Sequence, residues 1–380
     1  MGFLPRPRTG QLLTIGGVTL LLLAVLVIAP AALRFETPRA APASRTVEGT
    51  VARVIEEHLD TSPRGEILSR TIEVAAEGRL VTVQQQLVTR SERMLAAAPG
   101  DRVLLASMEG PDSEQTFFIV DRVRRSLLVL LTATFSLLVI AVGGWQGLRS
   151  LVGLAVSFAV ILRFVVPGVI AGYNPVGIAA AGSLAVMAAT LTLTRGATMR
   201  SATAFAGTAF ALVLTVLLAS GTFGIARISG LAEEDALIVG ALFGDIDPRG
   251  LLLAGIVIGA LGVLDDVAMA QSSTVFELRR ANPALSVNEL FVRGMVVGRD
   301  HIASTVNTLV LAYAGASLPL LLLLLTVAEP LGTLVNREIL AVEIIRALTG
   351  SIGLVAAVPF TTAAAAFVAI RYGDDESASA

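Results

Sequence analysis

The sequence predicts a polytopic α-helical membrane protein with about eight transmembrane helices and a small extracytoplasmic β-rich, barrel-like domain. Hydrophobic residues make up 54% of the chain and charged residues only 15%, and the mean hydropathy is +0.79. Soluble domains carry about 25% charged residues, so much of this surface must face lipid. One stretch near the N-terminus has instead the composition of a soluble domain.

The predicted spans are eight apolar runs, and each approaches or exceeds the roughly 20 helical residues that a bilayer core requires. They are Leu12–Ala32, Ser126–Val142, Leu148–Ile170, Val176–Thr194, Thr203–Phe223, Leu251–Ala270, Ile302–Val327 and Arg346–Ile370. The first run could also be a signal peptide, because two arginines precede it, but its length favours an uncleaved span. We therefore expect an N-terminal helix in 1–35, a β-rich domain in 36–121, a seven-helix bundle in 126–370 and an acidic tail in 371–380.

Arginines in the short connections predict the orientation, because cytoplasmic loops carry an excess of basic residues. Starting with Arg6 and Arg8 inside, the predicted crossings place a further set of arginines on the cytoplasmic side. These are Arg149, Arg195, Arg200, Arg279, Arg280, Arg293, Arg299 and Arg371. Both termini are therefore expected to be cytoplasmic, and the β-rich domain lies on the other side of the membrane.

Five strand-like runs separated by turn signals predict the β-rich domain. They are Thr46–Ile55, Ile67–Val74, Arg79–Val88, Arg102–Ala106 and Thr116–Val120. Short strands in about 85 residues are typical of a small barrel, either closed or half closed, and a sandwich is the alternative. The domain could serve as a stabilising lid or could sense a ligand or a protein partner.

Composition excludes several kinds of chemistry. The chain has no Cys, and all 28 of its basic residues are Arg. Disulfides, thiolate catalysis and Lys Schiff bases are therefore excluded, as is a Lys-dependent ATP-binding P-loop. His58 and His301 are the two histidines, which argues against a His-rich metal site. A net charge of −2 gives no reason to expect nucleic acid as a partner, and no cofactor is expected.

The segment Leu251–Ser273 carries ionisable residues, whose insertion into a membrane has a high free-energy cost. Asp265 and Asp266 lie within it, and an ionisable side chain in a span costs about 2.5–3.5 kcal/mol unless it finds a partner or water. Three small residues precede Asp266 on the same helical face: Gly255, Gly259 and Gly262. Such residues allow a neighbouring helix to approach closely, so we expect this face to pack against another helix.

The following span supplies the expected partner for these carboxylates. Asp300 lies near its start, Ser304 and Asn307 follow at i+4 and i+7, and Arg299 and His301 flank the stripe. The candidate ion- or substrate-binding residues are therefore Asp265, Asp266, Arg299, Asp300, His301, Ser304 and Asn307. Two adjacent carboxylates can bind a proton or a cation. The alternative is a salt-bridged structural contact between helices.

Two local pairs are also predicted from spacing. Ser286 and Glu289 have the spacing of a capping box at a helix start. Glu343 and Arg346, at i and i+3, can pair with each other.

Three stretches resemble signature sequences of the YibE/F-like family of bacterial multi-pass membrane proteins. They are Leu261–Val267, Gly298–Leu309 and Ala312–Leu320, and the likeness extends from the β-rich domain to the last span. The resemblance implies a location in the bacterial plasma membrane. Many relatives have a hydrophobic residue in place of Asp265 and an acid that matches Asp266, which implies that Asp266 is the more important carboxylate.

These observations favour a non-enzymatic secondary transporter or permease for a small ion or solute, coupled to protons or cations. Lipid and that ion or solute are the expected partners. The sixth predicted span is rich in Gly, as helices at transport sites often are, although no inverted repeat stands out. An intramembrane aspartyl protease would need paired Asp residues, but the Gly-x-Gly-Asp pattern is missing around Asp266 and Asp300. A sensor or assembly protein acting through the β-rich domain is the main alternative.

Overall fold

The computed structural model describes residues 45–62, 65–87, 96–109, 115–196, 198–232, 234–244, 246–327 and 329–377. The predicted first span, Leu12–Ala32, lies outside the described residues, and so does its interpretation as a signal peptide. The described chain divides into two compact units, with the boundary between Val142 and Gly143.

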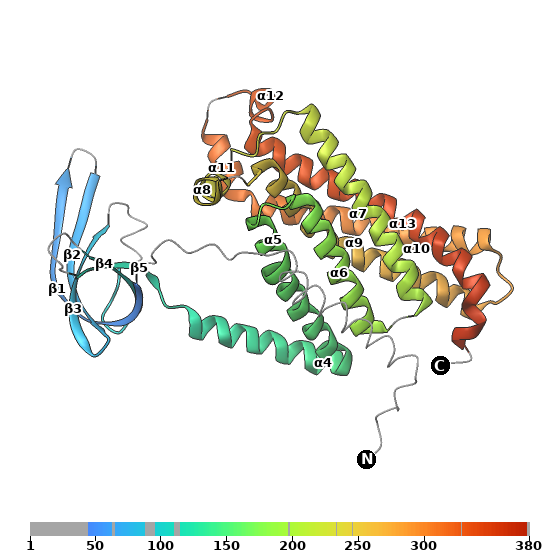
Figure 1. Ribbon diagram of the computed structural model, residues 1–380, viewed down its shortest axis with the longest axis horizontal. Coiled ribbons are helices and arrows are strands. Elements are labelled where there is room, and N and C mark those ends of the chain that lie inside the picture. Colours follow the sequence, from blue (N-terminus) through green and yellow to red (C-terminus); the bar gives the residue numbers. More distant parts are fainter. Residues whose placement is uncertain are drawn as a thin grey trace, which may run out of the picture. The chain divides into compact units, whose positions relative to one another are not determined.

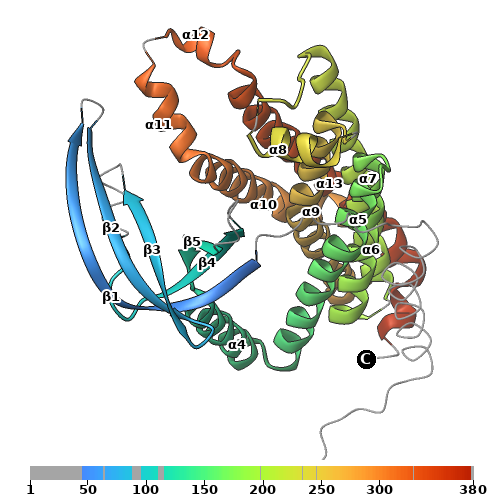
Figure 2. The same cartoon turned by 60° about the vertical axis from the view of Figure 1, so that its left-hand side comes forward.

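The first unit contains a five-stranded antiparallel sheet in the order β3-β2-β1-β4-β5 (Figures 1 and 2). Its strands are β1 (Arg45–Ser62), β2 (Gly65–Ala76), β3 (Arg79–Leu87), β4 (Arg102–Glu109) and β5 (Gln115–Arg122). All five predicted strands are present, and β1 is much longer than predicted. The edge strands β3 and β5 also contact each other. The sheet therefore curls into a half-closed barrel, which decides between the barrel and the sandwich.

Apolar side chains alternate along the strands and fill the barrel, as the two-residue period of a strand requires. The side chains with at most 1% exposure include Val51, Ile72, Val74, Val103 and Leu105. The hairpin between β2 and β3 turns at Glu77 and Gly78, whose φ angles are 51° and 76°. Positive φ at both central residues is the geometry of a tight turn that matches strand twist, and Gly adopts it without strain.

Arg70 is a nearly buried charge that joins three parts of this unit. Its side chain is 10% exposed, and its Nε donates to Oε2 of Glu57 at 2.9 Å. Its Nη1 donates to the backbone oxygen of Ala97, also at 2.9 Å. In contrast, Arg53 pairs with Glu73 at 2.7 Å but stays 70% exposed. The Arg53 guanidinium holds the pKa of the Glu73 carboxyl below its usual value through a hydrogen bond and charge attraction.

Replacing Arg70 should therefore loosen the barrel more than replacing Arg53. We expect Arg70→Met to lower the stability of the unit by about 2 kcal/mol, because it removes charged hydrogen bonds from a buried place. Arg53→Met is the matched control, and its expected effect is smaller, since exposed ion pairs are weak. Amide hydrogen exchange of β2 measures both. Equal effects of the two substitutions would contradict this description of Arg70.

The second unit is helical and begins within α4 (Arg125–Val160). The helices that follow are η2 (Ile161–Val165, a π-helical turn), α5 (Val166–Ile170), α6 (Pro175–Arg195), α7 (Met199–Ile225), α8 (Glu234–Phe243), α9 (Pro248–Ala281), α10 (Val287–Ala316), α11 (Leu318–Thr326), α12 (Leu331–Leu334) and α13 (Glu338–Ser377). Polar caps start several of them. Ser286 and Glu289 form the predicted capping box at the start of α10, and Asn174 accepts a hydrogen bond from the Gly177 amide at the start of α6.

The described residues include five helices that are long and apolar enough to cross a membrane, or up to six if a bent pair is one span. The predicted spans Ser126–Val142 and Leu148–Ile170 fall in one helical run, Arg125–Ile170. This run is interrupted at Gly144, where φ is 55° and ψ is −135°, a conformation that essentially only Gly adopts. The predicted span Ile302–Val327 is the bent pair, with 60° between α10 and α11. Of the acidic tail, the residues up to Ser377 continue α13.

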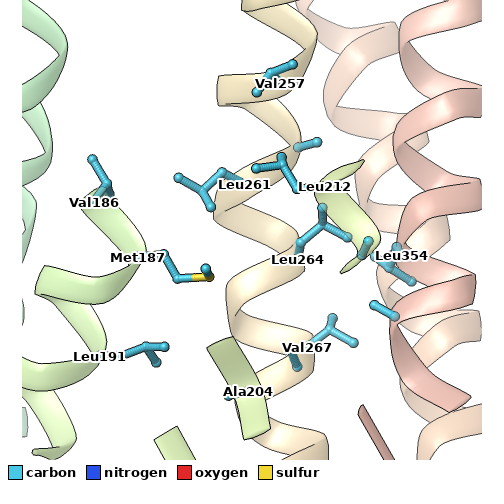
Figure 3. Packing of buried hydrophobic residues seen from close by; sticks show 14 of the residues in the cluster. Val186, Met187, Leu191, Ala204, Leu212, Val257, Leu261, Leu264, Val267 and Leu354 are labelled. Carbon is cyan, nitrogen blue, oxygen red and sulfur yellow. The ribbon is translucent and has the colours of Figure 1, made fainter. Parts of the chain in front are cut away.

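Helix α9 lies at the centre of the second unit and packs against α6, α7, α10 and α13 (Figure 1). Figure 3 shows Leu264 of α9 beside Leu212 of α7 and Leu354 of α13, while Met187 of α6 points toward α9. Small residues at the crossings let these helices approach closely. Because α9 packs against these four helices, its rotation is fixed. The side chains on its face that these helices leave uncovered therefore point in a defined direction.

Candidate functional site

A cavity of about 690 Å³ lies between α4, α6 and α9 in the second unit. Its polar lining residues are Gln146, Ser150 and Ser157 from α4, Thr190, Thr194 and Arg195 from α6, and Asp265, Asp266 and Ser273 from α9. A cavity of this volume can hold a small solute or a hydrated ion. Two carboxylates and a series of hydroxyls thus face one space inside the helical unit.

The two adjacent carboxylates of α9 are the main charged groups of this cavity. Oδ1 of Asp265 is buried and has no hydrogen-bond partner among the described residues. Asp266 is more exposed, and it interacts electrostatically with Arg195 and His301. Arg195 also attracts Asp265. A buried carboxylate oxygen without a partner is unfavourable unless water, a proton or a cation reaches it, so this arrangement is suited to binding one of these.

Three hydroxyl groups of the cavity already donate their protons to backbone oxygens. Ser157 donates to the backbone oxygen of Gly153 at 2.9 Å, and Thr194 donates to that of Thr190 at 2.7 Å. Thr190 donates in turn to the backbone oxygen of Met187 at 3.1 Å. A hydroxyl has one proton, so these groups have only lone pairs left for a ligand. Together with the carboxylates they form an oxygen-rich wall that suits a cation or a solute rich in hydrogen-bond donors.

The α10 residues predicted for the site are mostly placed elsewhere. Asp300, Ser304 and Asn307 lie on the exposed face of α10, and Arg299 is exposed as well. His301 is the one member of this group that interacts with Asp266. The structure therefore places Asp265 and Asp266 at the cavity, with His301 near enough to attract Asp266, and leaves the predicted stripe outside.

The orientation of α10 has a steric cause. An added Cβ at Gly298 would lie 2.6 Å from Cγ1 of Val358, and one at Gly294 would lie 2.8 Å from Cγ2 of Thr362. This glycine face therefore packs tightly on α13, and it also lies close to Gln271 and Val275 of α9. Successive helical residues are about 100° apart, so Asp300, two residues beyond Gly298, points away from that contact.

The glycine stripe of α9 leaves space instead of packing tightly. Around Gly255 and Gly262, an added Cβ would meet nothing within 4 Å among the described residues. At Gly259 it would lie 3.4 Å from the Tyr313 hydroxyl, an ordinary contact. Gly262 lines the cavity one turn before Asp266. The close helix contact predicted for this stripe is therefore not formed between the described residues.

Several cavity residues were not predicted as site residues. Ser150 and Ser157 are two turns apart on α4, and Thr190 and Thr194 are one turn apart on α6. Hydroxyl residues that recur at helical spacing inside apolar spans could have predicted a polar face on each of these helices. Arg195 was used only to predict the membrane orientation. Its proximity to α9 depends on how α6 packs, which the sequence does not reveal.

Two further observations bear on the chemistry. In the parts of the chain that the structure describes, no group of three or more His, Cys, Asp or Glu side chains could hold a metal ion. The predicted pair of Glu343 and Arg346 is present, with Arg346 Nη1 donating to Glu343 Oε1 at 2.9 Å.

The long apolar helices are compatible with a polytopic helical membrane protein, and the polar cavity lies between three of them. A family model described as YibE/F-like protein matches residues 131–371, which is more than half of the chain, and the chain belongs to this family. The match leaves out the β-rich domain, so membership rests on the helical part of the chain. No curated protein and no solved structure matches the chain.

The different surroundings of two glycines test the placement of these helices. We expect Gly262→Ala to leave the stability unchanged or raise it by up to about 1 kcal/mol, because Ala favours a helix and the space is open. Gly298→Ala should lower it by about 1–3 kcal/mol through overpacking against Val358. Thermal unfolding of the purified protein measures both. A reversed order of the two effects would mean that α9 and α10 face other directions.

Proposed function

We propose that the protein is a secondary transporter or permease for a small ion or solute, coupled to protons or cations at Asp265 and Asp266. The observation that carries the proposal is the cavity between α4, α6 and α9, which holds a buried carboxylate oxygen without a hydrogen-bond partner among the described residues. Ionisable groups in a membrane mark ion and substrate pathways. A static contact between helices would instead pair this oxygen with a donor.

The proposed topology has eight spans, cytoplasmic termini and an extracytoplasmic β-rich domain, in the plasma membrane of a bacterium. The apolar helices and the family support a membrane location. In this topology Arg195 and Arg200, at the connection between α6 and α7, lie on the cytoplasmic side. The carboxylates on α9 then lie near the inner end of the membrane-spanning region.

The charges suggest how the site exchanges its ligand. Arg195 balances the carboxylates electrostatically when nothing is bound. A cation or a proton that reaches Asp265 and Asp266 takes over that role and weakens their attraction for Arg195. Binding is then coupled to a movement of the Arg195 side chain at the end of α6, which is the kind of local change that a coupled transporter uses.

Catalysis by paired carboxylates is less well supported. An intramembrane aspartyl protease needs two Asp side chains from different helices that face one another. Asp300 lies on the exposed face of α10, whereas Asp266 lines the cavity. This separation favours binding and transport over proteolysis.

A sensor or assembly role for the β-rich domain is the second candidate. One observation favours it: the compact unit that contains the barrel extends to Val142 and so includes the first part of α4. A ligand or protein partner of the barrel would thereby act directly on a membrane helix. Deleting residues 46–120 should leave flux through the cavity intact if the domain only stabilises the protein, and should abolish the response if it senses.

Cysteine accessibility tests the proposed function, because the chain contains no native Cys. We expect Ser150→Cys, in the cavity, to react with a membrane-impermeant thiol reagent from at least one side of sealed vesicles. Na⁺, K⁺ or Mg²⁺ that binds at the carboxylates should slow this reaction, and Asp266→Asn should remove the slowing.

Ser304→Cys is the matched control, because Ser304 lies on the outward face of α10 and is expected to stay unmodified in the membrane. If Ser150→Cys is folded but unreactive from both sides, the cavity is dry and the transport proposal fails.

A further inference from the structure

Two helices of the second unit carry the same pattern of residues at four-residue spacing. The pattern is Thr203, Gly207, Ala211 and Thr215 on α7, and Thr349, Gly353, Ala357 and Thr361 on α13. Residues four apart lie on one helical face. Each helix therefore presents a similar stripe of small and hydroxyl side chains.

The two stripes face each other in a reciprocal way. An added Cβ at Gly207 would overlap Oγ1 of Thr361, and one at Gly353 would overlap Oγ1 of Thr215. The glycine near the N-terminal end of each stripe thus contacts the threonine at the C-terminal end of the other stripe, so α7 and α13 run antiparallel. Both threonines are fully buried. Figure 1 shows α7 and α13 side by side.

Further matched features of the two helices strengthen the comparison. Ala211 and Ala357, at the middle of each stripe, are both fully buried. Arg200 and Arg346 precede the first threonine by three residues in each helix. Each of these arginines is ion-paired, Arg200 with Glu277 at 2.7 Å and Arg346 with Glu343 at 2.9 Å.

We propose that α7 and α13 are equivalent helices of an inverted-topology repeat, and that their interlocked crossing is the rigid pivot of the helical unit. An approximate two-fold axis in the membrane plane, between Ala211 and Ala357, relates the two helices. Inverted repeats of this kind underlie many secondary transporters, whose sites lie at the repeat interface. The pivot rests on the proposed transport function, whereas the repeat itself does not.

The packing explains why this crossing is rigid. A threonine in a glycine notch blocks sliding of one helix along the other, because the residues next to each glycine carry side chains. The two glycine–threonine contacts are eight residues apart along each helix, or about 12 Å, so they fix the crossing angle as well as the position. Thr203 is also hydrogen-bonded to Ser272 of α9 at 2.6 Å. The helix that carries Asp265 and Asp266 is therefore attached to the pivot.

Paired substitutions test the interlock and its symmetry. Gly207→Ala and Gly353→Ala should each lower the midpoint of thermal unfolding by roughly 5 °C or more through overpacking. Gly221→Ala, also on α7 but with no described residue within 4 Å, should cause no loss. Thr215→Ala should rescue Gly353→Ala, because the remaining Cβ would lie 3.4 Å away. Thr361→Gly should rescue Gly207→Ala, since there even the threonine Cβ is too close, at 2.9 Å.

The repeat would be overturned if either glycine accepted Ala without loss, or if only one of the two contacts showed rescue. A disulfide then tests the pivot. Gly353→Cys with Thr215→Cys suits a disulfide, because the two Cβ positions are 3.4 Å apart, at the short edge of the roughly 3.5–4.5 Å that disulfides span. In the full chain with Ser150→Cys, the closed disulfide should change the thiol reaction of the cavity by less than about twofold.

Loss of that reaction only after disulfide closure would overturn the pivot. Absence of the reaction even before closure would overturn both the transport function and the pivot that rests on it. The thermal unfolding results would still decide the repeat, so the two failures are distinguishable.

Discussion

The contact between α7 and α13 is the constraint on which the rest of the helical unit depends. Each helix gives a glycine notch and a threonine to the other, at Gly207 with Thr361 and at Gly353 with Thr215. Without a hydrophobic driving force between helices in lipid, such close fits and hydrogen bonds hold helices together. Helix α9 packs against both members of the pair. Its orientation, and with it the direction of the two adjacent carboxylates, follows from this contact.

Helix α10 is likewise oriented by glycines that pack tightly on a neighbouring helix. Its glycines 294 and 298 press against α13, which turns the stripe through Asp300 outward. The cavity therefore forms on the opposite flank of α9, where α4 and α6 supply hydroxyl groups. In this protein, the small residues at helix contacts fix the helix rotations, and these rotations determine which polar side chains lie close together. Polar residues then decide what the resulting space can bind.

Much of the architecture was predictable from the sequence, because it depends on local patterns. Alternation and turn residues identified all five strands, and apolar length identified the helices α6, α7, α9 and α13. The capping box at Ser286 and the pair of Glu343 with Arg346 depend on neighbours in sequence and were also correctly predicted. The cost of charge in a membrane singled out Asp265 and Asp266, which line the cavity.

The failures came where distant residues set the geometry. The stripe through Asp300, Ser304 and Asn307 was expected to face α9 because it is polar, but the fit of Gly298 against Val358 fixes the helix rotation. A helical stripe alone does not say which neighbour it meets. The matched pattern on α7 and α13 is too short to be noticed in a sequence. It becomes informative only when its glycines and threonines are seen in contact.

Direct ligand binding to the two carboxylates tests the central claim. The measurement is calorimetric titration of the purified protein with Na⁺, K⁺, Mg²⁺ and Mn²⁺ in turn. Wild-type protein is compared with Asp265→Asn combined with Asp266→Asn, and with Asp300→Asn as the control. We predict that at least one titrant binds to the wild type and to Asp300→Asn but is lost from the double variant. Identical titrations of all three proteins would contradict a binding role for these carboxylates.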